Sequence, residues 1–267
     1  MDLPAEWTQR TVSANGIDLQ YYRVGSGPSI ILVHGFGDTG RRWVPLADEL
    51  AEEYDVITYD ARGHGRSDAP ETGYNISDRV ADLRGLIDEL NVEQPILLGH
   101  SIGGGTVGWL AARHPDLPRG VILVDPDCFH DLPERNPEEL FEESRQRLRN
   151  GHERTVEEIV EEQYPDMDPT HARRLATGHL ESGLEIAELA REGYPAPLVE
   201  TFPDISCQAL VLRSDRDVEE RAADVDAAES LQSGRLVHVP EAGHYVIRDS
   251  FDAAYTEIQT FLRRLDS

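Results

Sequence analysis

Short runs of Val, Ile and Leu, each bounded by turn residues, constrain the fold of this chain more than any other feature. Such runs are typical of strands buried on both faces, as in a parallel sheet. Helical segments separate several of them, and this alternation predicts a doubly wound, mostly parallel α/β sheet. The predicted strands are Ser29–Val33, Asp55–Tyr59, Pro95–Leu98, Gly120–Val124, Ala209–Leu212 and Arg235–Val239. The predicted helices are Pro45–Glu53, Ile76–Leu90, Ile102–Arg113, Glu219–Leu231 and Phe251–Leu265.

Two stretches depart from this pattern. Arg10–Val24 alternates apolar and polar residues around Asn15-Gly16, which predicts an antiparallel hairpin on the sheet edge. Residues 126–205 are rich in proline and in Glu- and Arg-rich helical segments, without a strand signal. We therefore expect a core domain of residues 1–125 and 206–267 and a helical cap of residues 126–205. An insertion after a strand's carboxyl end would lie over the ligand crevice of an open α/β sheet, so we expect a lid. A stabilising side domain is the alternative.

The charge of the chain limits its partners. Asp and Glu number 51 against 25 basic residues, all of them Arg, so the formal net charge is −26. Such a surface repels nucleic acids and anionic membranes, and neither is an expected partner. The sequence has no apolar run long enough to span a membrane and no signal-peptide pattern at its start, so we expect a cytoplasmic protein. An acidic composition without lysine resembles that of proteins from salt-loving organisms.

The cysteines indicate neither a disulfide scaffold nor a metal site. Cys128 and Cys207 are the only two, and no Cys or His spacing matches a zinc site. Cys128 follows one predicted strand, and Cys207 precedes the next. If those strands are parallel neighbours, the two thiols lie at opposite edges of the sheet. We therefore expect two free thiols and no metal.

The sequence Gly99-His100-Ser101-Ile102-Gly103 carries the strongest chemical signal. It is G-x-S-x-G with a predicted strand before it and a helix after it, which is the context of a nucleophile elbow. The glycines leave room for a tight turn that exposes the serine hydroxyl. The helix start presents unpaired N–H groups to a developing anion. Ser101 is the predicted nucleophile.

A serine nucleophile needs a base, and the base needs a carboxylate. His244 follows the last predicted strand and precedes the last helix, which places it at the same sheet edge as Ser101. Asp215 and Asp217 both follow the strand Ala209–Leu212, and Asp217 is further from the strand end and better able to reach across. We expect Asp217 to be the acid, with Asp125 as its main rival. The order Ser, Asp, His is the one expected for this arrangement.

An oxyanion hole needs two converging N–H donors. One is the amide of Ile102, directly after the nucleophile. The other is expected in the loop His34-Gly35-Phe36-Gly37, where the Phe36 amide is the natural candidate.

Several motifs together resemble the α/β-hydrolase superfamily. They are HGFGDTGRRW, YDARGHGRSD, GHSIGG, LVLRSDRD and AGHY. The resemblance covers residues 10–125 and 206–265. It implies Ser101, Asp217 and His244 as the catalytic triad and Phe36 and Ile102 as oxyanion donors. The acid loop of this family usually reads Gly-x-x-Asp, whereas Ser214 stands at the glycine position here.

The predicted reaction is cleavage of a carboxylic ester through an acyl-enzyme, without cofactor or metal. Lactones, thioesters, carbon–carbon bonds beside a carbonyl and peracid formation use the same triad and remain alternatives. The segment Gly35–Gly40 also matches G-x-G-x-x-G, with Asp60 at the end of the next strand, which leaves NAD(P) binding as a competing interpretation. A non-catalytic binding protein of the same fold is a third.

Overall fold

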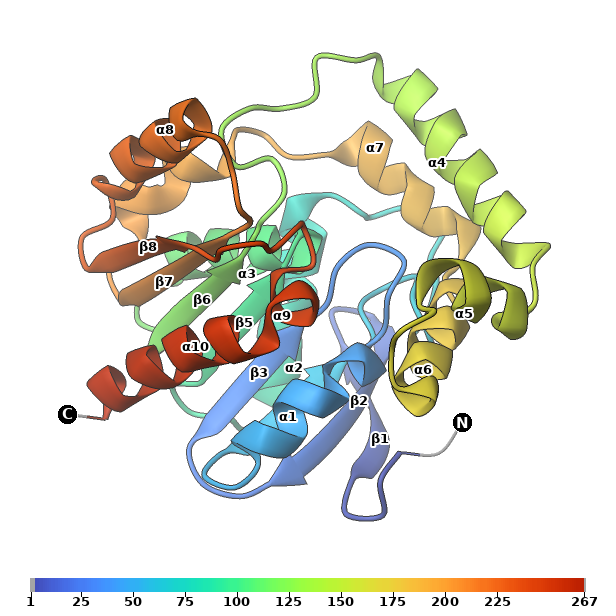
Figure 1. The fold of residues 1–267 in the computed structure, drawn as a ribbon, viewed down its shortest axis with the longest axis horizontal. Helices are drawn as coiled ribbons and strands as arrows, with labels where there is room; N and C mark the ends of the chain where they lie inside the picture. Colours follow the sequence, from blue (N-terminus) through green and yellow to red (C-terminus); the bar gives the residue numbers. More distant parts are fainter. Residues whose placement is uncertain (1–2, 267) are drawn as a thin grey trace. The chain divides into compact units, whose positions relative to one another are not determined.

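Figure 1 shows the computed structural model, which describes residues 3–266. The chain divides into two units, each assembled from separate segments. The first unit comprises the residues up to Pro28, Phe36–Asn91 and Pro133–Tyr194. The second comprises Ser29–Gly35, Val92–Leu132 and the residues from Pro195 onward.

The first unit contains the predicted hairpin. β1 (Thr8–Ala14) and β2 (Ile17–Gly25) pair antiparallel, with Ala14 opposite Ile17. Asn15 and Gly16 both have positive φ values, 50° and 78°, as a tight two-residue hairpin turn requires. β4 (Asp55–Tyr59) pairs antiparallel with the other side of β2.

The first unit also contains several helices. They are α1 (Val44–Leu50), α2 (Ile76–Glu89), α4 (Pro137–His152), α5 (Val156–Gln163), α6 (Pro169–Leu180) and α7 (Leu189–Glu192), with 3-10 turns η1 (Gly40–Trp43) and η2 (Leu184–Glu188). The side chain of Asn75 accepts bonds from the amides of Ser77 and Asp78 and so caps α2 at its predicted start. α1 ends at Leu50, three residues before the predicted end.

The helices inserted between β6 and β7 are bonded to the N-terminal segments of their unit. The carboxylate of Glu192 accepts bonds from the amides of Gly73, Tyr74 and Asn75, at 3.1, 2.5 and 2.9 Å. Arg41, which is fully buried, forms an ion pair with Glu181. Residues 133–194 thus belong to one unit with β1, β2 and β4. The division at residues 126–205 and the lid role stay predictions.

The second unit is built around a five-stranded parallel sheet. β3 (Ser29–Val33), β5 (Ile96–His100), β6 (Gly120–Val124), β7 (Gln208–Arg213) and β8 (Gly234–His238) lie side by side in that order. Its helices are α3 (Ile102–Arg113), α8 (Val218–Ala228), α9 (Val246–Asp249) and α10 (Phe251–Leu265), with the 3-10 turn η3 (Leu198–Asp204). The bounds of β3, β6, α3 and α10 are those predicted from the sequence.

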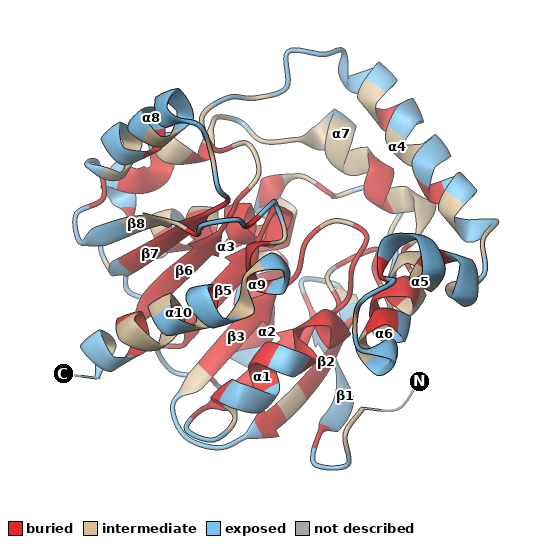
Figure 2. Cartoon of the chain, in the orientation of Figure 1, coloured by how far each residue is buried: buried red, intermediate tan, exposed pale blue. Residues whose placement is uncertain are grey.

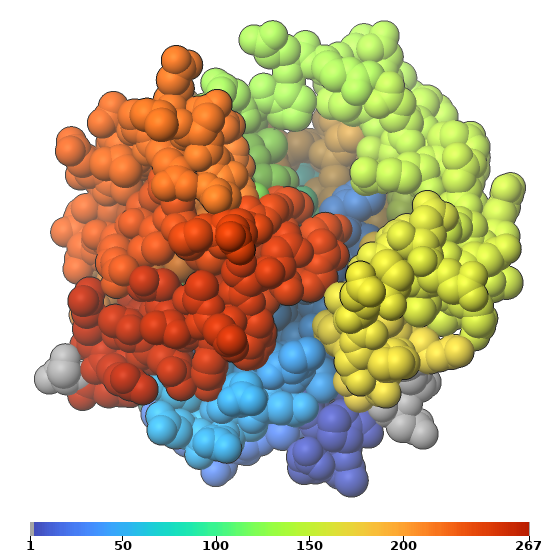
Figure 3. Space-filling model, in the orientation of Figure 1, coloured from blue at the N-terminus to red at the C-terminus, as the bar shows by residue number. Residues whose placement is uncertain are grey.

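The core of this sheet is covered on both sides. α3 packs against β5 and β6, and α10 packs against β7 and crosses in front of the sheet in Figure 1. Every residue of β5 and β6 is buried, as Figure 2 shows, which explains why these strands lack alternation. In the space-filling view, the C-terminal residues form a continuous surface on this side of the unit (Figure 3).

Cys128 and Cys207 are not joined by a disulfide, and β6 and β7 are parallel neighbours, as predicted. Cys128 follows the carboxyl end of β6 and Cys207 precedes the amino end of β7, so the sheet separates them. Burial raises the pKa of the Cys207 thiol to about 11.

Among residues 3–266, every helix is too short or too polar to span a bilayer.

Candidate active site

Ser101 occupies the sharp turn between β5 and α3. Its backbone has φ 53° and ψ −123°, a conformation that residues other than glycine rarely adopt. Its amide donates to the carbonyl of Val124 at 3.0 Å, and its carbonyl accepts from the amide of Gly105. Strain of this kind costs on the order of 1–3 kcal/mol and is found mainly where function requires it. The geometry is that of the predicted nucleophile elbow.

Two glycines make this turn possible. A Cβ at Gly103 would stand 2.4 Å from the carbonyl oxygen of Val33 and 2.5 Å from that of His34. A Cβ at Gly99 would stand 2.2 Å from the carbonyl oxygen of Gly103. Side chains at either position would therefore push the elbow away from the sheet.

The two predicted oxyanion donors fall in different units. Ile102 is the first residue of α3 and lies in the second unit with Ser101. Phe36 begins a segment of the first unit, where Arg147 lies over its ring at 5.0 Å and His64 meets it edge-on. The convergence of the Ile102 and Phe36 amides stays a prediction.

His244 lies in the loop between β8 and α9, where the sequence predicted it. His100, the residue before Ser101, donates from Nε2 to the carbonyl oxygen of His244 at 2.9 Å. The two imidazole rings lie 4.8 Å apart between centroids. The loop that carries His244 is therefore bonded directly to the strand that carries the elbow.

The carboxylate that meets His244 is Asp125. His244 Nδ1 donates to Asp125 Oδ2 at 2.7 Å. Asp125 directly follows β6, and its side chain is only 4% exposed, whereas that of His244 is 47% exposed. The hydrogen bond fixes the tautomer of the neutral imidazole with its proton on Nδ1 and its lone pair on Nε2.

This geometry favours Asp125 over the predicted Asp217 as the acid. The Asp217 side chain accepts from the amides of Glu219 and Glu220, at 3.0 and 2.9 Å, and so caps α8. Asp215 is also occupied, since it accepts from the amide of Glu241 and pairs with Arg221. α8 begins at Val218, which leaves Asp217 exposed at the helix start. The rival, Asp125, has the position that we expected of Asp217.

The sequence itself indicates that Asp217 caps a helix. Asp217 is followed by Val218, Glu219 and Glu220, a helix-start pattern with an Asp cap and acidic residues in the first turn. Ser214, which departs from the usual glycine of the family's acid loop, donates to Asp125 Oδ1 from its amide at 3.3 Å and from its hydroxyl at 3.2 Å. The unusual residue thus bonds the carboxylate that meets His244.

Two arginines complete the surroundings of Asp125. Arg213 Nη1 lies 3.1 Å and Arg216 Nη2 3.4 Å from Oδ1. Burial on its own would raise the pKa of the Asp125 carboxyl. The hydrogen bond from His244 and the charge of Arg213 outweigh this effect, with help from the Ser214 amide, and hold that pKa well below its ordinary value. Asp125 is therefore ionised throughout the range near pH 6.5 in which an ordinary histidine titrates.

Asp60, the acidic residue of the competing dinucleotide motif, has structural partners. Its Oδ1 accepts from the amide of Gly40 at 2.8 Å, and its Oδ2 accepts from the Tyr22 hydroxyl and the Arg66 amide. A 3-10 turn, not an α-helix, begins at Gly40. These hydrogen bonds give the Asp60 carboxylate a structural role that needs no nucleotide ribose.

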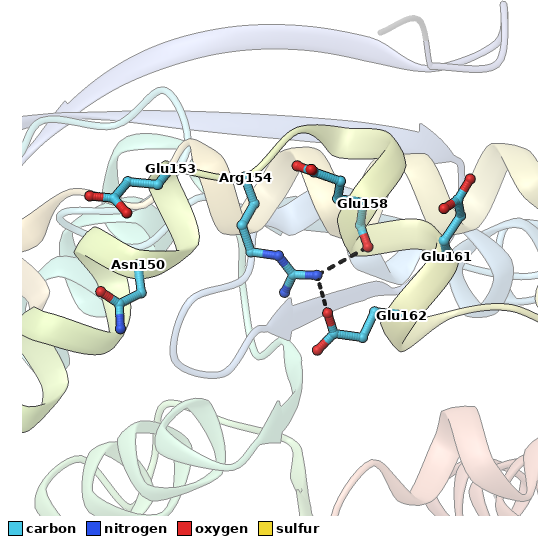
Figure 4. A pocket seen from close by; sticks show the side chains of 6 residues that line it. All are labelled: Asn150, Glu153, Arg154, Glu158, Glu161 and Glu162. Carbon is cyan, nitrogen blue, oxygen red and sulfur yellow. Dashed lines mark hydrogen bonds and ion pairs between the residues drawn. The ribbon is translucent and has the colours of Figure 1, made fainter.

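A hollow of about 560 Å³ lies at the connection of α4 and α5, lined by Asn150, Glu153, Arg154, Glu158, Glu161 and Glu162. Figure 4 shows Arg154 directed between Glu158 and Glu162. Its guanidinium donates to the backbone carbonyl of Glu158 and to the carboxylate of Glu162. None of the predicted site residues lines this hollow. Across residues 3–266, His, Cys, Asp and Glu form no group of three or more suited to a metal ion.

Comparison with known proteins identifies the family of this chain. The family model described as "alpha/beta hydrolase fold" matches residues 28–204. The 2-(acetamidomethylene)succinate hydrolase of Mesorhizobium japonicum is 30% identical to this chain over 288 aligned residues, which cover 98% of the chain and 99% of that protein. These matches confirm the predicted fold class.

Solved structures agree as well. The crystal structure of E-2-(acetamidomethylene)succinate hydrolase superposes with a TM-score of 0.79 at 27% identity, covering 96% of this chain and 99% of that one. The enol-lactonase from Burkholderia xenovorans LB400 superposes with a TM-score of 0.79 at 25% identity, covering 95% of this chain and 100% of its own.

Proposed function

Because this chain belongs to the α/β-hydrolase family, we propose that it is a serine hydrolase with Ser101 as nucleophile, His244 as base and Asp125 as acid. The observation that carries the proposal is the 2.7 Å hydrogen bond from His244 Nδ1 to Asp125 Oδ2, in the unit that also holds Ser101 on its strained elbow. Nucleophile, base and orienting carboxylate recur in this form in serine hydrolases of unrelated folds.

The reaction begins with His244. With Nδ1–H held by Asp125, the Nε2 lone pair accepts the Ser101 proton as the serine oxygen attacks the carbonyl carbon of the substrate. The imidazolium that forms is stabilised by the Asp125 carboxylate. It then protonates the leaving group, which departs and leaves an acyl-Ser101. Water, deprotonated by His244, attacks this ester, and Ser101 recovers its proton.

The tetrahedral intermediates carry a negative oxygen that needs donors. We propose the amides of Ile102 and Phe36 for this role. The amide of Ile102 belongs to the first turn of α3, where the helix dipole also favours negative charge. Removal of one such donor typically costs about 10²–10³ in kcat.

The substrate class is a carbonyl compound with a leaving group, and a carboxylic ester is our first candidate. The similarity to the enol-lactonase at 25% identity favours cyclic esters as a second candidate. The similarity to the 2-(acetamidomethylene)succinate hydrolase makes that compound a third. Thioester, carbon–carbon and peracid chemistry stay alternatives on the same residues.

A substrate panel tests the proposal. p-Nitrophenyl esters of increasing acyl length, simple and enol lactones, and 2-(acetamidomethylene)succinate are offered to the wild type and to Ser101→Ala. We expect turnover of at least one class by the wild type, and a loss of about 10⁶-fold in the variant. A folded Ser101→Ala protein that keeps a tenth of the activity overturns the proposal.

A further inference from the structure

Arg213 lies between two buried carboxylates. It is the last residue of β7, and its side chain is 4% exposed. Nη1 lies 3.1 Å from Oδ1 of Asp125, and Nε lies 3.0 Å from Oδ2 of Asp224. The guanidinium carbon also lies 4.1 Å from the ring centre of Phe129, so a ring face packs against the planar group. Both ends and one face of the guanidinium are thereby held.

Asp224 is the less expected member of this set. It lies on α8, in a helix that is otherwise mostly exposed, yet its side chain is 1% exposed. Besides Arg213, it accepts from His130 Nε2 at 2.7 Å and from His238 Nε2 at 2.9 Å. Burial alone would raise the pKa of the Asp224 carboxyl, but the charge of Arg213 and the two histidine bonds lower it. A buried carboxylate with three donors is an anion held in a fixed place.

The two oxygens of Asp125 have different partners. Oδ2 makes the short bond to His244, while Oδ1 receives the longer contacts from Arg213, Arg216 and Ser214. An anchor on Oδ1 prevents rotation of the carboxylate and keeps Oδ2 directed at the imidazole. Two guanidinium charges this near also oppose the positive charge that His244 acquires during catalysis. A negative charge behind Arg213 offsets this effect.

We propose that Arg213 and Asp224 are positioning residues of the triad: Arg213 fixes Oδ1 of Asp125, and Asp224 holds Arg213 and balances its charge. Both side chains are buried, 4% and 1% exposed. The proposal rests on the proposed serine-hydrolase function and adds to it a pair of residues that holds the acid in place and balances the charge beside it. The titratable and charged groups that face the Asp125–His244 pair or its supports are His100, Tyr245, Arg213, Arg216, Asp224, His130 and His238.

The test is the pH profile of kcat/KM, whose acid limb reports the base of the free enzyme. Asp224→Asn removes a negative charge and keeps the side-chain shape, so the acid limb should move to lower pH by roughly half to one unit. Arg213→Gln removes a positive charge, so the limb should move to higher pH by a similar amount, and kcat should fall about tenfold or more as Asp125 loses its anchor. If the two residues have only a structural role, the substitutions lower the melting temperature, but the acid limb of neither variant moves.

Asp226→Asn is the matched control. It removes the same charge from the same helix two residues on, where the side chain is exposed, and should leave the acid limb in place. Asp224→Asn is the deciding variant if Arg213→Gln does not fold, because its amide can still accept from Arg213. An acid limb in Asp224→Asn that coincides with that of the wild type overturns the proposal.

The two proposals fail differently. Labelling of the wild type with a fluorophosphonate comes first. If Ser101 of the wild type is not labelled, the serine-hydrolase function fails, and this inference fails with it. If Ser101 is labelled and the limbs of Asp224→Asn and Arg213→Gln do not move in opposite directions, only the positioning role fails.

Discussion

His244 Nδ1 lies 2.7 Å from Asp125 Oδ2, although 119 positions separate the two residues in the chain. The order of the strands in the sheet explains this contact. β6 carries Asp125 at its carboxyl end, β8 precedes His244, and both strands pair with β7 in parallel. The loop after β8 therefore crosses only one strand to reach the end of β6, and an acid on either β6 or β7 could have met the histidine.

Asp125→Asn should reduce kcat by roughly 10³- to 10⁴-fold, because an amide at this position can donate to Nδ1 and favours the wrong imidazole tautomer. Steady-state kinetics on the best substrate of the panel measures this loss.

Asp217→Asn is the control for that variant. Asn caps helices about as well as Asp, so both activity and melting temperature should stay near the wild type. If Asp217→Asn is the crippling change and Asp125→Asn is mild, the acid has been assigned to the wrong strand.

Ser214→Gly restores the residue that is usual in the family and removes the hydroxyl bonded to Asp125 Oδ1. A hydrogen bond to a charged group contributes about 1.5–3 kcal/mol. The amide and two arginines still contact the same oxygen, so we expect roughly a tenfold fall in kcat, at the lower end of that range. KM should change little, because Ser214 acts on Asp125 and not on the substrate. An unchanged kcat would show that the hydroxyl has no part in holding the acid.

Gly103→Ala should destabilise the fold by several kcal/mol, since its Cβ would stand within 2.5 Å of two carbonyl oxygens. Gly151→Ala provides the contrast: it is also a helical glycine, no atom lies within 4 Å of the added Cβ, and the change should stabilise by about 0.5–1 kcal/mol. Chemical denaturation of both variants measures the difference. Equal stabilities would mean that the elbow does not approach the sheet as closely as described.

Stability should rise with salt. With a net charge of −26, repulsion among carboxylates opposes the folded state. The screening length falls from about 10 Å at 0.1 M salt to about 3 Å at 1 M, which removes most of that repulsion between exposed groups. Melting curves from about 0.1 to about 3 M KCl should shift upward. A flat or falling melting temperature would contradict salt adaptation and leave the triad untouched.

The sequence predicted the strands, the elbow and the position of His244 because each depends on local information. Unbroken apolar runs mark buried strands, and G-x-S-x-G between strand and helix marks a tight turn. The acid depends on which strands are neighbours and which way a loop turns, and neither is local. Asp217 looked suitable by its distance from the strand, whereas its neighbours Glu219 and Glu220 indicated a helix start.

The grouping of the inserted helices could not be predicted for the same reason. Glu192 is one of many acidic residues in an acidic segment, and nothing nearby in the chain identifies the amides of Gly73, Tyr74 and Asn75 as its partners. Contacts between distant segments determine which unit these helices join.

The central claim is that Ser101 is an activated nucleophile, and covalent labelling tests it most directly. The wild type, Ser101→Ala and Asp125→Asn are incubated with a fluorophosphonate, and intact and peptide mass spectrometry locate the adduct. We predict one adduct on Ser101 in the wild type, none in Ser101→Ala, and labelling slowed by several hundredfold or more in Asp125→Asn, in line with the roughly 10³–10⁴ expected for the wrong tautomer. An unlabelled wild type, or an adduct that persists in Ser101→Ala, would contradict the account.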